Sequence, residues 1–152
     1  MTSKHSYFHE LEIKQLFTDE IERIFALDEV IDDLDCNVTI YSEFDDKASN
    51  VSLPCILVSL NDVSTHTRGS TFDDNQFATD FTLECDIYSN NLTGYSRQNA
   101  VLHIGELLNK YLTDKYNAFE VSSVPLPNID TNIARRLYRF SGTLDNSQNI
   151  LY

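Results

Sequence analysis

Apolar residues recur at three- and four-residue spacing near the start of the chain, with charged residues between them. This spacing places one apolar stripe along a helix, so it predicts an amphipathic helix over residues 6–27, which the acidic residues 28–35 end. Residues 97–113 show the same spacing after Ser96, a favourable N-cap residue, and predict a second helix. The apolar positions of the two helices are Ile13, Leu16, Phe17, Ile21, Ile24 and Phe25, and Ala100, Val101, Ile104, Leu107, Leu108, Tyr111 and Leu112.

Strict alternation of apolar and polar residues marks the predicted strands. It is clearest over residues 77–88, where every second residue from Phe77 to Ile87 is apolar or a small uncharged residue. Such alternation is typical of a strand with one solvated face. Shorter strands are predicted over residues 37–44, 53–60, 119–124 and 133–144, and the prolines within residues 125–127 indicate a stiff extended linker.

Residues 61–76 are polar and are too many for a tight turn between the second and third strands. We therefore expect these two strands to extend into a protruding hairpin arm. Long polar arms usually contact something, and the contact candidates are Arg68, Phe72, Asp73 and Asp74. The alternative is a disordered loop tip.

The predicted order is one helix, three strands, one helix and two strands, without a repeat or an internal linker between domains. This order favours one α+β domain over residues 1–152. We expect a mainly antiparallel sheet with two helices packed on one face and the long β-hairpin arm described above.

Composition agrees with a folded domain. The chain has 152 residues, of which 41% are hydrophobic, and its 9 Phe and 8 Tyr can bury a core that a disordered acidic chain lacks. Cys36, Cys55 and Cys85 are an odd number and lie in or beside apolar runs, which predicts buried free thiols in a reducing compartment. No apolar signal sequence or span of membrane length is present, so the protein is expected to be soluble and cytosolic.

The charge is strongly negative and uneven. Residues 10–46 hold 13 Asp and Glu against two bases, Lys14 and Arg23, so they carry −11 of the formal net charge of −13. Such a surface repels phosphates, which argues against sequence-specific nucleic-acid binding and against docking on anionic membranes. The one basic cluster is Arg135, Arg136 and Arg139; these arginines either pair with neighbouring acids on the sheet or form a phosphate or partner-docking site.

Motifs for catalysis are missing from the sequence. With only 4 Gly there is no G-x-S-x-G elbow or phosphate-cradling loop, and the acids that flank Cys85 would raise its thiol pKa rather than activate it. The histidines His5, His9, His66 and His103 are scattered, and residues 33–44 lack the glycine and the final glutamate of a calcium loop. The sequence therefore predicts a protein that is not an enzyme and that binds no cofactor or metal.

Several segments of the sequence suggest a protein family. They are the strand pair LPCILVSLNDV and DFTLECDIYSN around the polar arm, the helix RQNAVLHIGELLNKYL, and the ending ARRLYRFSGTLDNSQNILY. In their order and over nearly the whole chain they resemble the tail terminator or tail-completion proteins of long-tailed bacteriophages. Related minor capsid and head-tail joining proteins share these features.

The resemblance implies a virion structural protein that forms a homohexameric ring. Such a ring caps the tail tube, ends its polymerisation, and docks the head connector or stopper protein at the head-tail interface. Genomic DNA passes through the lumen without sequence-specific binding, and acidic side chains facing the lumen would keep the duplex from adhering. Assembly in the host cytoplasm is implied as well.

A second hypothesis comes from the charge asymmetry alone. Spaced carboxylates can copy the phosphates of DNA, so the protein could be an acidic inhibitor or DNA mimic that blocks a basic partner. Neither hypothesis requires chemistry at an active site.

Overall fold

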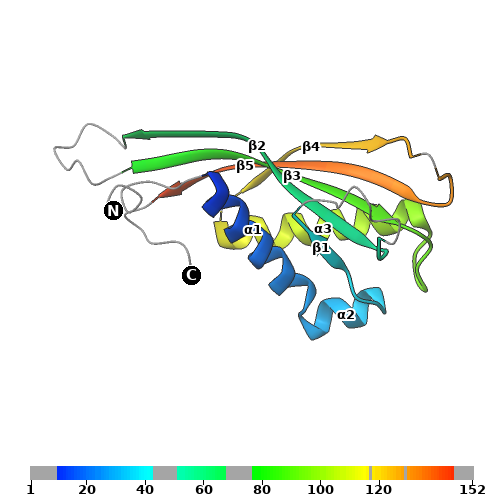
Figure 1. The fold of residues 1–152 in the computed structure, drawn as a ribbon. Coiled ribbons are helices and arrows are strands. Elements are labelled where there is room, and N and C mark those ends of the chain that lie inside the picture. The colour runs from blue at the N-terminus through cyan, green and yellow to red at the C-terminus, as the bar shows by residue number, and fades with distance from the viewer. Residues whose placement is uncertain (1–9, 43–50, 68–76, 117, 129, 146–152) are drawn as a thin grey trace.

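A computed structural model of the protein describes residues 10–42, 51–67, 77–116, 118–128 and 130–145. The elements follow one another as α1 (Glu10–Phe25), α2 (Asp28–Leu34), β1 (Thr39–Tyr41), β2 (Cys55–Thr67), β3 (Phe77–Ser89), α3 (Arg97–Tyr116), β4 (Phe119–Leu126) and β5 (Ala134–Asp145). The three helices lie on one side of the sheet (Figure 1). The α+β class expected from the sequence is therefore confirmed.

The five strands form an open sheet in the order β1-β2-β3-β5-β4. The β2/β3, β3/β5 and β4/β5 pairs are antiparallel, whereas β1 pairs with β2 in parallel. The sheet is thus mixed: it is mainly antiparallel, as expected, and the parallel β1/β2 pair is the exception. Thr39 pairs with Cys55 and Tyr41 with Leu57, so β1 and β2 begin at the same end of the sheet.

Helix α2 is the other difference from the sequence analysis, which expected the acidic residues 28–35 to end a helix rather than form one. Its seven residues bury Val30 and Leu34, and Asp35 ends it with a left-handed backbone (φ 56°) whose N–H bonds to the carbonyl of Ile31. A helix this short depends on tertiary contacts, which an acidic sequence pattern does not reveal.

The ends of several elements also differ from prediction. Strand β1 is shorter than residues 37–44, β2 continues to Thr67, and α3 continues to Tyr116. Strand β4 includes Pro125 and Leu126, which the sequence analysis placed in a linker. Proline is tolerated there because β4 is an edge strand and pairs only with β5.

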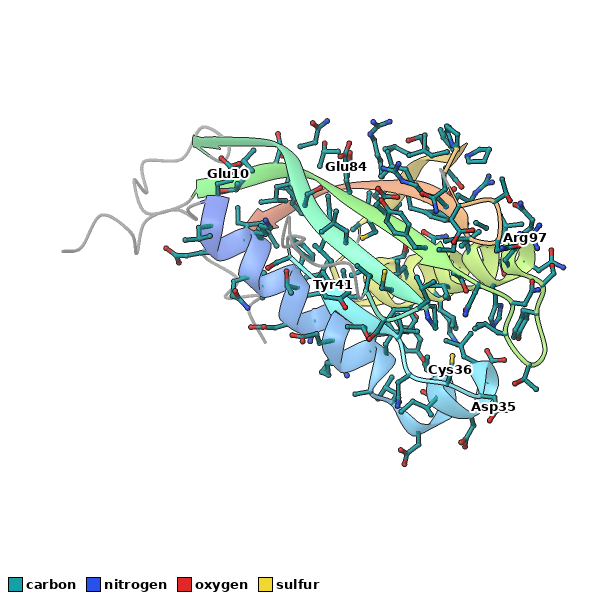
Figure 2. All side chains as sticks on the ribbon, turned by 45° about the vertical axis from the view of Figure 1, so that its right-hand side comes forward. Glu10, Asp35, Cys36, Tyr41, Glu84 and Arg97 are labelled. Atoms are coloured by element: carbon teal, nitrogen blue, oxygen red, sulfur yellow. The ribbon has the colours of Figure 1, made fainter. Side chains whose placement is uncertain are left out.

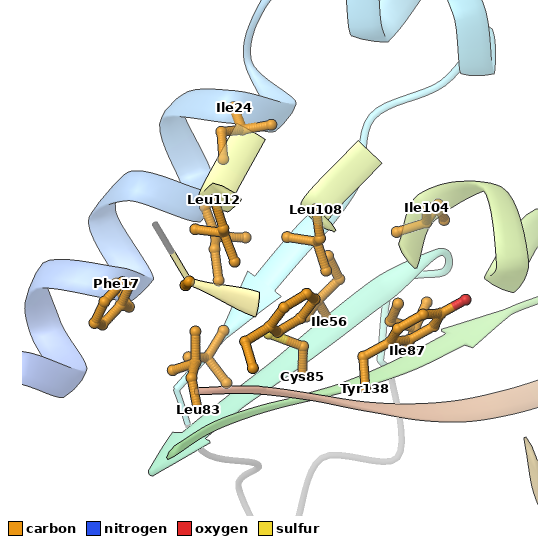
Figure 3. Packing of buried hydrophobic residues seen from close by; sticks show 14 of the residues in the cluster. Phe17, Ile24, Ile56, Leu83, Cys85, Ile87, Ile104, Leu108, Leu112 and Tyr138 are labelled. Carbon is orange, nitrogen blue, oxygen red and sulfur yellow. The ribbon is translucent and has the colours of Figure 1, made fainter. Parts of the chain in front are cut away.

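The core lies between the sheet and the helices. Alternate residues of β3, among them Leu83, Cys85 and Ile87, point toward the helices and are fully buried, as the period-two pattern predicts. Figure 3 shows side chains of α1 and α3 packing onto them. The apolar stripes of both helices supply this layer, chiefly Ile13, Phe17, Ile21, Ile24, Ile104, Leu108 and Leu112.

Helix α3 passes very close to β5 at Gly105. A Cβ atom at this position would lie 2.0 Å from Cζ of Tyr138, well inside any allowed contact. Tyr138 is buried under the helix, and its hydroxyl donates a hydrogen bond to the carbonyl of Leu102 (3.4 Å). The missing side chain of Gly105 therefore sets how closely α3 can approach the sheet.

Candidate assembly surfaces

The sheet has a second face, which no helix of the described residues covers; we call it the open face. Figure 2 shows Glu84 on this side, away from α1. On β3 and β5 the open face consists of Asp80, Thr82, Glu84, Asp86, Tyr88, Arg135, Leu137, Arg139, Ser141 and Thr143. Most of these residues are polar, so the face differs sharply from the apolar side under the helices.

Polar residues of β3 and β5 are joined across the open face. Arg139 Nε donates to Glu84 Oε2 (2.7 Å), and the hydroxyls of Thr82 and Ser141 lie 3.3 Å apart. Such cross-strand pairs each contribute about 0.2–1 kcal/mol and favour one register of the two strands.

Arg135 and Asp86 form the most buried of these pairs. Arg135 Nη2 lies 2.6 Å from Asp86 Oδ2, and the guanidinium also stacks over the ring of Tyr88 at 5.1 Å from the centroid. The hydrogen bond to Asp86 raises the pKa of Arg135, while burial and the charge of Asp86 raise the pKa of Tyr88 to about 12. Both groups therefore keep their protonated forms, and the buried carboxylate is balanced by a fixed cation.

The basic cluster foreseen in the sequence consequently has partners within the sheet. Arg135 and Arg139 pair with acids of β3, which confirms the first of the two alternatives for these residues. Arg136 Nε instead donates to Ser123 Oγ of β4 (2.6 Å). A contact of the three arginines with another protein stays a prediction.

Strand β4 forms one edge of the sheet and exposes large apolar side chains. Phe119 is 55% exposed, Val121 57% and Val124 41%. A hollow of about 370 Å³ lies beside Phe119, lined also by residues 80–82 of β3 and residues 141–143 of β5. Exposed apolar residues on an edge strand favour association, so this edge is a candidate contact surface.

The first two helices and Asp35, the residue that follows α2, expose nine of the protein's 24 Asp and Glu side chains. They are Glu10, Glu12, Asp19, Glu22, Asp28, Glu29, Asp32, Asp33 and Asp35. Arg23 is exposed among them, but it binds Glu20. The charge asymmetry of the sequence is thus displayed as one acidic helical surface.

Glu20 is the exception, because it is buried between α1 and α3. It accepts hydrogen bonds from Arg23, from Lys115 Nζ (2.9 Å) and from the hydroxyl of Tyr116 (3.3 Å). Burial by itself would raise its pKa, but the hydrogen bonds and positive charges of Arg23 and Lys115 outweigh burial and lower it. Glu20 therefore remains ionised and fastens α1 to α3.

Polar contacts fasten α2 in a similar way. Asp33 accepts a hydrogen bond from the hydroxyl of Tyr95 (2.8 Å) and lies 2.6 Å from Nε2 of His103, while Tyr111 donates to Glu29 (2.9 Å). The hydrogen bonds with His103 and Tyr95 lower the pKa of Asp33. These contacts are the tertiary support that the short acidic helix needs.

The cysteines are free, as predicted, although Cys36 is only half-buried. Burial raises the pKa of Cys85 strongly, with smaller contributions from Asp86 and Glu84, and it raises the pKa of Cys55 to about 12. Neither buried thiol is activated as a nucleophile.

The contact candidates Arg68, Phe72, Asp73 and Asp74 lie outside the described residues, as do His5 and His9. Within the described ranges there is no group of three His, Cys, Asp or Glu that could hold a metal ion. The helices there are also too short or too polar to cross a membrane.

Sequence reasoning did not single out Phe119, Val121 or Val124. Residues 119–124 were expected to form a short strand, but the sequence does not say which predicted strand lies at an edge. The nearby Pro125 and Pro127 were a usable signal, because proline within a strand segment indicates an edge.

No family model matches the sequence, and no curated protein matches it.

Proposed function

We propose that the protein is a structural protein of a phage or phage-derived particle. It forms a ring that caps the tail tube, ends the polymerisation of the tube, and joins the tail to the head connector, with DNA passing through the lumen. Its partners are further copies of itself in a homohexamer, the tail tube protein, and a connector or stopper protein. The proposal starts from the resemblance of the sequence to tail terminators.

The observation that best supports it is the open sheet with its long central hairpin. Strands β2 and β3 have 13 residues each and pair as far as Thr67 and Phe77. Their far ends extend beyond α1 in Figure 1. An open sheet has two edges that can contact neighbouring subunits, and a ring requires each subunit to bury two different patches.

The hairpin arm belongs to this proposal. We expect the segment between β2 and β3 to reach the tube or a neighbouring subunit, with Arg68, Phe72, Asp73 and Asp74 in contact. The arginines Arg135, Arg136 and Arg139 are further interface candidates.

The acidic helical surface fits the same role. Carboxylates near the path of DNA repel its phosphates, so the duplex slides without adhering. The proposal requires part of this surface, or other acids of the chain, to face the lumen.

The first experiment is light scattering coupled to gel filtration over a concentration series, with and without the tail tube protein from the same genome. Six copies of the 17.4-kDa chain give 6 × 17.4 = 104.4 kDa. The expected result is a species near this mass, alone or on the tube. Electron microscopy should then show shorter tubes with capped ends when the protein is present during tube polymerisation.

A second candidate function is an acidic inhibitor or DNA mimic. It is favoured by the nine exposed carboxylates of the acidic helical surface, where the sequence has few bases. A monomer under all conditions, with no effect on tube length, would contradict the ring. If that monomer bound a basic DNA-binding protein with an affinity that falls as salt is added, the inhibitor would be the better interpretation.

A further inference from the structure

Large hydrophobic residues that are exposed lie mainly at the two edges of the sheet. Five such residues occur in the described ranges. Three of them are on β4, and a fourth, Leu11, is 77% exposed at the start of α1 beside β2. Only Leu102, 37% exposed on α3, belongs to neither edge. This distribution favours two contact patches on opposite sides of the subunit.

The first patch, which we call the β4 patch, consists of Phe119, Glu120, Val121, Val124 and the hollow beside Phe119. The ladder between β4 and β5 is irregular between Glu120 and Ser122, so Val121 has no partner in the register. Pro125 also lacks an N–H. Both features interrupt the row of main-chain donors on this edge, so contact through side chains is favoured over addition of another strand.

The second patch, which we call the α1 patch, consists of Glu10, Leu11, Lys14, Ser59 and Leu60. These residues line a hollow of about 430 Å³ between the first turns of α1 and strand β2. Strand β1 covers β2 only from Cys55 to Leu57, so Ser59 and Leu60 lie beyond it. This patch therefore combines an exposed apolar side chain with a recess, as the β4 patch does.

Charge also distinguishes the two patches. The α1 patch holds one base, Lys14, beside the acid Glu10, whereas the charged residues of the β4 patch are both acids, Glu120 and, at the hollow, Asp80. Within the described part of the chain neither Lys14 nor Glu120 forms an ion pair. A base on one patch and only acids on the other favour contact between unlike patches and give that contact an orientation.

We propose that the β4 patch of one copy of this chain packs against the α1 patch of the next copy. Phe119 enters the recess beside Leu11, and Glu120 approaches Lys14. Because the two patches differ, the contact is heterologous, and repetition around an axis gives a ring. This inference rests on the self-association in the proposed function, but it requires neither a tail tube nor DNA.

Cross-linking of two variants, each with one exposed cysteine, tests the contact directly. Cys36 is replaced by serine in all samples, because it is the one cysteine that is not buried. Leu11→Cys protein and Phe119→Cys protein are then mixed at high concentration and treated with a short bismaleimide. The expected product is a dimer that contains one copy of each variant, identified by mass spectrometry after one variant has been isotope-labelled.

The matched control is Leu102→Cys, also at an exposed apolar residue. Mixed with either of the other variants, it should give at least tenfold less cross-linked dimer. Equal yields from the Leu102→Cys mixtures, or no mixed dimer from the first pair, would overturn the proposed contact.

Exchange of the charges at Lys14 and Glu120 provides a second test. Its outcome for the contact does not depend on whether the protein is a tail terminator. Lys14→Glu and Glu120→Lys should each weaken self-association several-fold in light scattering, whereas the double variant should regain most of it. If all three variants form the wild-type ring, the contact is wrong but the ring stands. If the contact is found and the tubes remain uncapped, the contact stands and the terminator function fails.

Discussion

The same strands form both faces of the sheet, but the two faces differ in the residues that they present and in what those residues contribute. On the helix-covered face, β3 contributes residues such as Leu83 and Ile87, which are fully buried against α1 and α3. On the open face, the alternating residues of the same strand form polar pairs, as Asp86 does with Arg135. Burial of apolar surface drives folding, whereas polar pairs contribute little net energy but are specific for their partners. The covered face therefore supplies most of the stability, and the open face helps to fix the strand register.

The largest expected change in stability comes from a substitution on the helix-covered face. Phe17→Ala should lower the free energy of unfolding by about 3–5 kcal/mol, because it leaves a cavity in the core. The Phe17 ring lies 4.7 Å from the ring of Phe81 and 5.1 Å from that of Tyr116, measured between centroids. Urea denaturation measures the change. Leu102→Ala, at an exposed position of α3, is the control and should stay within about 0.5 kcal/mol of wild type.

Gly105→Ala tests how tightly α3 packs on the covered face. Alanine in the middle of an exposed helix usually stabilises it, but here its Cβ would collide with the buried ring of Tyr138. We expect a loss of about 1–3 kcal/mol, measured by urea denaturation. Gly94→Ala is the matched control, since a Cβ there would meet nothing within 4 Å. A stabilised Gly105→Ala variant would contradict the close approach.

The open face can be tested within one strand. Arg135→Met leaves the buried carboxylate of Asp86 without its cation, so we expect a loss of about 2 kcal/mol. Arg139→Met removes the equivalent pair with Glu84, where both side chains are more exposed, and should cost about 0–1 kcal/mol. Thermal unfolding of both variants gives the comparison. Equal losses would show that burial does not distinguish the two pairs.

A smaller effect than that of Arg135→Met is expected at Glu20, a carboxylate buried between α1 and α3 in the otherwise apolar layer. Its folded pKa is lowered, so it contributes stability above its unfolded pKa, which is lost as the pH falls through the folded value. Glu20→Gln should therefore cost about 1 kcal/mol at pH 7, and this difference should shrink as the pH falls below the ordinary glutamate pKa of about 4.3 and vanish below the folded pKa. Urea denaturation between pH 3 and 7 measures it. Glu22→Gln, at an exposed position of α1, should show little difference at either pH.

The surfaces of the candidate site were only partly readable from the sequence. The acidity of residues 10–46 was evident from composition, and its display on α1 follows from the helical period, whereas its display on α2 was not predicted because that helix was not. The pairing partners of Arg135 and Arg139 required the register of β5 on β3, which joins residues about 50 positions apart. The apolar β4 edge was missed because being at an edge is a property of the whole sheet.

The sequence by itself determined the local elements with strong periodicity. The alternation over residues 77–88 specified β3 and its buried side, and the apolar stripes specified α1 and α3, because these patterns depend only on backbone geometry within one element. The tertiary structure decided the parallel pairing of β1 with β2, the strand order, and the formation of α2. These features depend on contacts between distant residues, such as Tyr111 with Glu29, and no local pattern records which surfaces will meet.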